Sequence, residues 1–151
     1  MNEDVLRLFK AIDNEDANML ERTVQICGPN VVDEMGDYAL IYSFYQKRYD
    51  MTSLLLRLGA DPYVKTFLGD NVLHLASKYG PLSLVKEICQ YQGDLNVLGQ
   101  DGFAAVNYAL YFKNFEIAKF LFKSGASLSI KDDVTGISAK EMVVILGVDF
   151  Y

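Results

Sequence analysis

The chain has 151 residues, of which 51% are hydrophobic, and its formal net charge is −6. This length suits one domain with a continuous core, and the composition indicates a compact fold instead of a disordered segment. The acidic charge disfavours nucleic acid as the main partner, because binding to phosphates depends on Lys and Arg. No apolar run approaches the roughly 18 residues that a membrane-spanning helix needs.

The amino-terminal segment MNEDVLRLFKAID is acidic and amphipathic. A secretory signal would instead begin with basic residues followed by an apolar stretch. We therefore expect an intracellular, cytoplasmic protein without a membrane span.

Glycines recur at a fixed spacing along the chain. Subtracting the successive residue numbers of Gly36, Gly69, Gly102 and Gly136 gives 33, 33 and 34. Apolar residues keep the same phase in two further sets, Leu40, Leu73 and Val106, and Leu55, Ile88 and Leu121. Such self-similarity at a fixed period predicts a repeat architecture.

Each repeating unit carries two helical patterns. In the third unit, Asn71 is a candidate helix cap and Gly80 a candidate left-handed terminator. Pro81 then suits the first turn of a second helix, in which apolar residues recur at helical spacing. One helix pair cannot bury its own apolar face, so we expect the units to stack into an all-α solenoid.

This glycine period, combined with NVLHLASKYG and LVKEICQYQGDLN, resembles the ankyrin repeat. His74 lies in the match to the family's T-P-L-H-x-A core, although Asn71 and Val72 replace Thr-Pro. The neighbouring units depart further, with Ile41 and Asn107 at the histidine position.

The resemblance implies an ankyrin-repeat solenoid of stacked helix-turn-helix units with β-turn or hairpin fingers. We expect a single domain, with repeats at about 1–32, 33–65, 66–98 and 99–131 and a partial capping repeat at about 132–151. The first repeat is degenerate and lacks a hairpin. The segment TGISAKEMVVILG indicates a final helix without a full partner.

Two turns lack the glycine that the family has after the first helix, because Lys47 and Lys113 stand there instead. A non-glycine residue in a left-handed turn costs on the order of 1 kcal/mol, so we expect these turns to be shaped differently.

Cys27 and Cys89 lie in apolar helical patterns, and we expect both to be reduced and buried.

His74 is the only histidine, and Ser77 and Lys78 lie near it in the sequence. It could belong to a catalytic site or serve the fold. The resemblance implies the structural role, because the family's histidine hydrogen-bonds backbone between neighbouring units. The resemblance likewise gives a structural role to the four framing glycines, Gly36, Gly69, Gly102 and Gly136.

Enzyme activity is not expected. With His74 committed to the scaffold, no histidine remains to activate a Ser, Cys or Thr nucleophile. Acidic pairs such as Asp132-Asp133 stand at helix starts or in loops, where carboxylates cap helices and are solvated. No Gly-rich phosphate loop and no metal-type Cys/His spacing occurs, so we expect neither a cofactor nor a metal site.

The resemblance places a binding face on the concave side, which the fingers and first helices form. There we expect a partner-binding set that folding does not need, namely Met35, Asp37, Tyr45, Phe67, Leu68, Asp70, Lys78, Tyr79, Asp101, Phe103, Tyr111 and Phe112. Exposed aromatic residues are common interface hot spots, and the acidic residues favour a partner with a basic surface. Alternatively, single rings could fill gaps in the core, or the row could join two copies of an otherwise monomeric chain.

Together these expectations indicate a non-catalytic protein-protein interaction module, such as an inhibitor, an immunity-type protein or an adaptor. Two alternatives stay open. A secreted or viral effector could compete for a host protein, and an accessory subunit could serve an enzyme.

Overall fold

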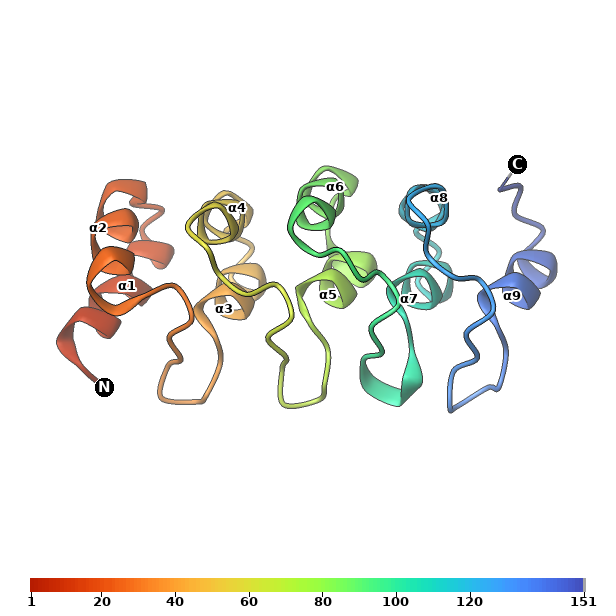
Figure 1. Cartoon of the computed structure of the whole chain (residues 1–151), viewed down its shortest axis with the longest axis horizontal. Coiled ribbons are helices and arrows are strands. Elements are labelled where there is room, and N and C mark those ends of the chain that lie inside the picture. The colour runs from red at the N-terminus through yellow and green to blue at the C-terminus, as the bar shows by residue number, and fades with distance from the viewer. Residues whose placement is uncertain (151) are drawn as a thin grey trace. The chain divides into compact units, whose positions relative to one another are not determined.

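The computed structural model describes residues 1–150. These residues contain nine α-helices and one short 3-10 helix, with isolated bridges in place of strands. The expected all-α fold is confirmed. The chain forms two compact units that divide between Phe67 and Leu68, and Figure 1 labels the helices of each unit. No helix within residues 1–150 has the length and apolar character needed to cross a membrane.

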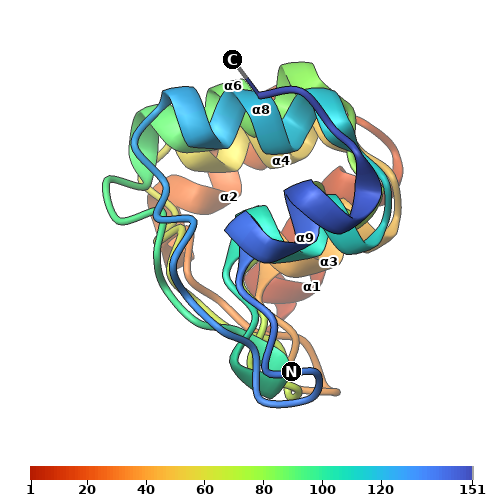
Figure 2. The same ribbon diagram turned by 90° about the vertical axis from the view of Figure 1, so that its right-hand side faces the viewer.

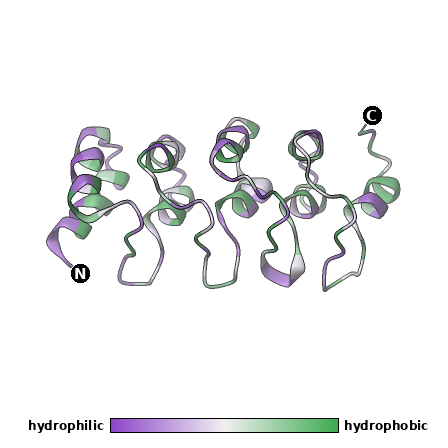
Figure 3. Ribbon diagram, viewed as in Figure 1, coloured by the Kyte–Doolittle hydropathy of each residue, from purple (hydrophilic) through white to green (hydrophobic). Residues whose placement is uncertain are grey.

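The first unit consists of two helix pairs. Their bounds are α1 Glu3–Asp13, α2 Ala17–Cys27, α3 Ala39–Tyr45 and α4 Tyr49–Arg57. In Figure 2, α2 and α4 lie in one layer and α1 and α3 in the other. The core of this unit includes the fully buried residues Leu8, Ile12, Leu20, Leu40 and Leu55. Figure 3 shows hydrophobic and hydrophilic sides on α1 and α2, and burying the hydrophobic side drives the pairs together.

An amide and an acidic side chain cap the amino termini of the first two helices. Asn2 Oδ1 accepts the Asp4 N–H at 2.8 Å, and Asp16 Oδ1 accepts the Met19 N–H at 2.9 Å. Both bonds satisfy N–H groups that have no partner within the helix. The capping role expected for the acidic residues of this region is therefore seen at Asp16.

The second unit contains two helix pairs and a final single helix. Their bounds are α5 Val72–Tyr79, α6 Leu82–Tyr91, η1 Gln100–Gly102, α7 Ala105–Tyr111, α8 Phe115–Lys123 and α9 Ala139–Leu146. In Figure 2, α6 and α8 share one layer and α9 lies in the other. The in-phase apolar residues Leu73, Ile88, Val106 and Leu121 are all fully buried.

The carboxyl-terminal end of the second unit lacks a complete helix pair within the described residues. After α9 the chain is extended, and Phe150 stacks on Phe122 with ring centroids 5.7 Å apart. Phe150 is only 2% exposed, so it buries apolar surface that a second helix would otherwise cover. The expected final helix without a full partner is α9.

The framing glycines mark the loops between the helix pairs. All four have positive φ, between 66° and 97°. Only glycine adopts this conformation without steric cost, which explains the regular spacing of these residues in the sequence. Isolated bridges, Val32 with Tyr38 and Lys131 with Ser138, close two of the loops.

The turns inside the helix pairs differ from expectation. Lys47 and Lys113 keep left-handed φ values of 56° and 60°, so the predicted change of turn shape is wrong. Backbone hydrogen bonds hold the left-handed turn, as in the Lys113 N–H to Leu110 carbonyl bond of 3.0 Å. Gly80, expected to be left-handed, is extended at φ −84°. Glycine is needed there for close approach, because a Cβ would lie 2.9 Å from the Ala76 Cα.

Candidate protein-binding surface

Most members of the expected binding set lie on the surface. The apolar ones that are exposed, by 42% to 101%, are Met35, Tyr45, Phe67, Leu68, Tyr79, Tyr111 and Phe112. Asp101 is exposed, and Asp37 is half-buried. Met35, Asp37, Tyr45 and Phe67 belong to the first unit and the other residues to the second.

Three rings form a cluster on the second unit, here called the aromatic surface: Tyr79, Tyr111 and Phe112. Tyr79 ends α5, Tyr111 ends α7, and Phe112 follows directly. The Tyr79 and Phe112 rings meet edge to face with centroids 5.4 Å apart, and Tyr111 lies 6.1 Å from Phe112. All three remain between 42% and 60% exposed. Stacking of two successive repeats therefore unites side chains that are distant in the sequence.

Beneath this surface lies a buried ring, and it corrects one expectation. Phe103 was expected on the exposed face, yet it is only 7% exposed. Its ring stacks on the buried Tyr108 at 4.9 Å and meets the edge of Tyr111 at 5.8 Å. Phe103 is thus part of the core that supports Tyr111.

Asp70 and Lys78 contact each other inside the second unit, whereas both were expected on the exposed face. Asp70 is 2% exposed, and Lys78 donates to its Oδ2 at 2.6 Å. The Lys78 ammonium also lies 4.1 Å from the centroid of the Tyr108 ring, a cation–π distance. The two charges are buried together because either one alone would be costly to desolvate.

The other oxygen of Asp70 connects parts of the second unit that are distant in sequence. Asp70 Oδ1 accepts the Tyr108 hydroxyl at 2.7 Å and the Gln100 N–H at 2.9 Å. Burial alone would raise the pKa of Asp70, but hydrogen bonds from Lys78, Gln100 and Tyr108 outweigh it and hold the pKa below its ordinary value. A Cβ at Gly99 would overlap Asp70 Oδ1, so the glycine leaves room for this carboxylate.

His74 is held by hydrogen bonds inside the second unit. The backbone N–H of His74 donates to Asn71 Oδ1, and its ring Nδ1 accepts the backbone N–H of Asn71, both at 3.0 Å. Because Nδ1 accepts, Nε2 carries the proton and donates to the Val97 carbonyl at 2.8 Å. Both ring nitrogens are engaged with backbone, and we interpret His74 as a scaffold residue.

The structure also contains a groove that the sequence reasoning missed. It lies on the first unit, where the rings of Phe9 and Tyr42 meet at a centroid distance of 5.0 Å. A signal for it existed in the sequence, because Phe9 and Tyr42 are separated by one glycine period and so occupy the same repeat position. Successive repeats bring equivalent positions side by side.

The described part of the chain contains two free thiols. Cys27 and Cys89 are free, but both are half-buried and not fully buried as expected. Burial raises the pKa of Cys89 to about 11, and burial followed by the charge of Asp4 raises the pKa of Cys27. Both thiols therefore stay protonated near neutral pH, the less reactive form. Within residues 1–150, no three His, Cys, Asp or Glu side chains lie close enough together to hold one metal ion.

Comparison with known proteins connects this architecture to a family. Residues 8–98 and 45–132 match the family model described as ankyrin repeats (3 copies). A Fowlpox virus (strain NVSL) protein named for ankyrin repeats is 28% identical over 130 residues, which are 85% of this chain and 69% of the viral one.

Two further similar proteins are longer than the present chain. A Saccharomyces cerevisiae protein named as p28, a 26S proteasome regulatory subunit, is 30% identical over 66% of this chain and 46% of its own length. The Drosophila melanogaster DNA replication inhibitor plutonium is 39% identical over 38% of this chain and 33% of its own. The chain thus aligns with less than half of the yeast and fly proteins.

Proposed function

Because the chain belongs to the ankyrin-repeat family, we propose that it binds a partner protein through its aromatic surface and acts without catalysis. Ankyrin repeats in general form protein-protein interaction modules. The observation that carries the proposal is the cluster of Tyr79, Tyr111 and Phe112, which touch one another and still expose about half of each ring.

The aromatic surface has the physical properties of an interface centre. Tyr and Phe rings bury large areas on contact and lose little conformational entropy, because each has only two side-chain torsions. Below them, Phe103 stacks on Tyr108 and contacts Tyr111, so the Tyr111 side chain is already partly ordered before a partner binds. Contiguous exposed apolar patches are typical of interaction sites.

Charge supports a partner with a basic surface. The chain carries a net charge of −6. Asp101, in the loop before α7, is exposed to solvent. Of the cations next to the aromatic surface in the sequence, Lys78 is neutralised by Asp70, and Lys113, which directly follows Phe112, is exposed. Complementary charge accelerates encounter, so we expect the association rate to fall as salt concentration rises.

The test replaces the three rings together with alanine (Y79A/Y111A/F112A). Partners are captured from the native cell with the wild-type chain and identified by mass spectrometry, and the affinity of the purified pair is then measured by calorimetry. We expect the triple variant to lose capture and to weaken binding by roughly 100-fold or more, since truncating a hot-spot residue costs about 2 kcal/mol.

A matched control replaces Tyr91 and Phe115, which are similarly exposed aromatic residues of α6 and α8. This variant should keep its partner, and the circular dichroism of both variants should equal that of the wild type. Equal affinity of the triple variant and the wild type would refute the proposed surface. Light scattering of the free chain shows whether the rings instead join two copies.

We propose that binding inhibits or recruits the partner. The names of two similar proteins, a replication inhibitor and a proteasome regulatory subunit, support a regulatory role. If the captured partner is an enzyme, titration with the wild-type chain should lower its activity and the triple variant should not. Full activity in the saturated complex would instead favour an adaptor.

A further inference from the structure

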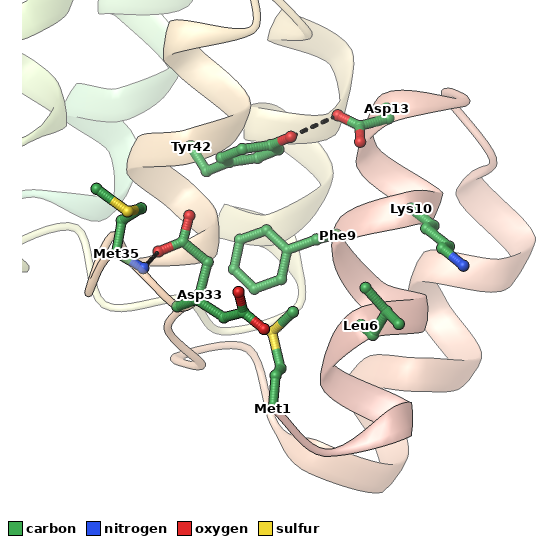
Figure 4. A pocket seen from close by; sticks show the side chains of 9 residues that line it. Met1, Leu6, Phe9, Lys10, Asp13, Asp33, Met35 and Tyr42 are labelled. Atoms are coloured by element: carbon green, nitrogen blue, oxygen red, sulfur yellow. Dashed lines mark hydrogen bonds between the residues drawn. The ribbon is translucent and has the colours of Figure 1, made fainter.

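The groove on the first unit is an amphipathic cavity of about 350 Å³ between α1 and the loop that leads into α3. Met1 and the α1 residues Leu6, Phe9, Lys10 and Asp13 line one side of it. The loop residues Asp33, Glu34 and Met35 and the α3 residue Tyr42 line the other, and Figure 4 shows these side chains. Its size lies within the range of roughly 300–1,000 Å³ found for ligand pockets. No member of this lining except Met35 belongs to the binding set expected from the sequence.

The groove combines aromatic and flexible apolar surface. Phe9 and Tyr42 meet nearly at right angles, at 86°, and Phe9 is 5% exposed, so the ring pair forms a fixed base. Leu6 and Met35 also line the groove and are 39% and 87% exposed. A methionine side chain adapts its shape to an apolar group that binds next to it.

Three carboxylates surround this apolar base. Asp13 Oδ1 accepts the Tyr42 hydroxyl at 2.8 Å, and Asp33 Oδ1 accepts the Met35 N–H at 2.8 Å. These bonds fix both carboxylates, whereas no hydrogen bond to either Oδ2 is found within residues 1–150. Glu34 is exposed beside them. Burial, followed by the bond to Asp13, raises the pKa of Tyr42 to about 12, so its hydroxyl stays protonated and keeps donating.

The Lys10 side chain does not balance the charges of the three carboxylates. In Figure 4 the side chain of Lys10 extends away from Tyr42 and Asp33. Three carboxylates thus face a groove whose base is apolar, and the matching occupant has an apolar stem and a cationic end.

We infer that this groove binds an arginine side chain in a basic segment of a partner protein. The aliphatic stem of arginine would lie on the apolar side chains of the lining. Its planar guanidinium would stack on the Tyr42 ring and donate to carboxylates of the lining, contacts that a point charge satisfies less well. The inference extends the proposed function, because the arginine belongs to a partner, but it concerns a different unit and different residues.

The experiment uses the full chain with 13C-labelled methionine methyl groups and a short peptide carrying one arginine between apolar and glycine residues. Of the five methionines, Met1 and Met35 line the groove, while Met19, Met51 and Met142 do not and serve as internal controls. We expect NMR titration to shift the Met1 and Met35 signals to saturation at millimolar peptide and to leave the other three unchanged.

Matched peptides and variants sharpen the result. Citrulline has the shape of arginine without its charge, and the citrulline peptide should cause no shift. Glu34→Gln should weaken the arginine peptide several-fold, since it removes one charged acceptor at an exposed site, while Glu21→Gln on α2 should not. Equal binding of the citrulline or a lysine peptide, equal shifts at all five methionines, or no shift would each overturn the inference.

The aromatic surface provides the remaining control. The Y79A/Y111A/F112A variant should bind the arginine peptide as the wild type does, because its substitutions lie on the second unit. Failure of the peptide to bind therefore counts against the groove alone, and retention of the native partner by the triple variant counts against the aromatic surface alone.

Discussion

At the scale of single residues, Asp70 connects three parts of the second unit. Its two oxygens receive hydrogen bonds from Lys78 on α5, from the backbone of Gln100 and from Tyr108 on α7. An aspartate buried without these donors would be destabilising. The same carboxylate therefore links these two repeats by hydrogen bonds, and its bond to Lys78 explains why the Lys78 ammonium points inward.

We predict that Asp70→Asn lowers the free energy of unfolding at pH 7 by about 3 kcal/mol, since it leaves the Lys78 ammonium without its buried partner. The pKa of Asp70 is lower in the folded chain than its ordinary value of 3.8, so its carboxylate stabilises the fold above that pH. This stabilisation disappears as the pH falls through the folded-state pKa. Urea denaturation of both proteins between pH 7 and pH 2.5 should therefore show the deficit shrinking below pH 3.8.

Asp101→Asn is the control, because this carboxylate is exposed and its loss should change stability by no more than about 0.5 kcal/mol. A deficit in the Asp70 variant that stays constant with pH would show that the loss of a hydrogen-bond acceptor, and not the loss of charge, is responsible.

At the scale of elements, the turns within helix pairs follow backbone hydrogen bonding more than residue type. The turn before α4 and the turn before α8 place lysine at positive φ. The turn before α6 contains glycine, yet that glycine is extended. α5 is one residue longer than α3 or α7, so in the third repeat the turn after the first helix begins one residue later.

We predict that Lys113→Gly raises the free energy of unfolding by about 1 kcal/mol, because it removes the steric cost of the left-handed conformation. The same substitution inside a helix should act in the opposite direction. Lys86→Gly on α6 should lower stability by about 1 kcal/mol. Thermal unfolding followed by circular dichroism measures both, and a Lys113→Gly protein no more stable than the wild type would contradict the strain.

At the scale of the whole molecule, each repeat of a stack relies on its neighbours, so the last helix needs a cover. α9 leaves Val144 and Ile145 exposed by 78% and 68%, whereas Phe150 is buried against Phe122. The extended segment after α9 thus covers part of the second helix layer.

We predict that Phe150→Ala lowers the free energy of unfolding by about 3 kcal/mol, since truncating a buried phenylalanine removes apolar contact and leaves a cavity. The loss should be local, with faster hydrogen exchange in α8 and α9 than in α5. Val144→Ala, at an exposed position of α9, should change stability by less than about 0.5 kcal/mol. Equal exchange rates in the Phe150 variant and the wild type would show that this ring does not act as a cover.

The sequence by itself determined the repeat. The ankyrin-repeat assignment is confirmed over residues 8–132, and the in-phase apolar residues are buried, because a fixed period determines which positions face the neighbouring repeat. The helix cap at Asn71 was predictable for a similar reason, since it depends only on the few residues that follow.

Only the tertiary structure decided which residues of the expected binding set are exposed. A repeat position specifies the direction of a side chain, but its exposure depends on what stands at the equivalent position of the next repeat. Asp70 and Phe103 are buried because Tyr108, which occupies a leucine position in the preceding repeat, supplies both a hydroxyl and a ring. Tyr79 and Phe112 meet because they occupy equivalent positions of successive repeats, so their contact depends on how the two repeats stack.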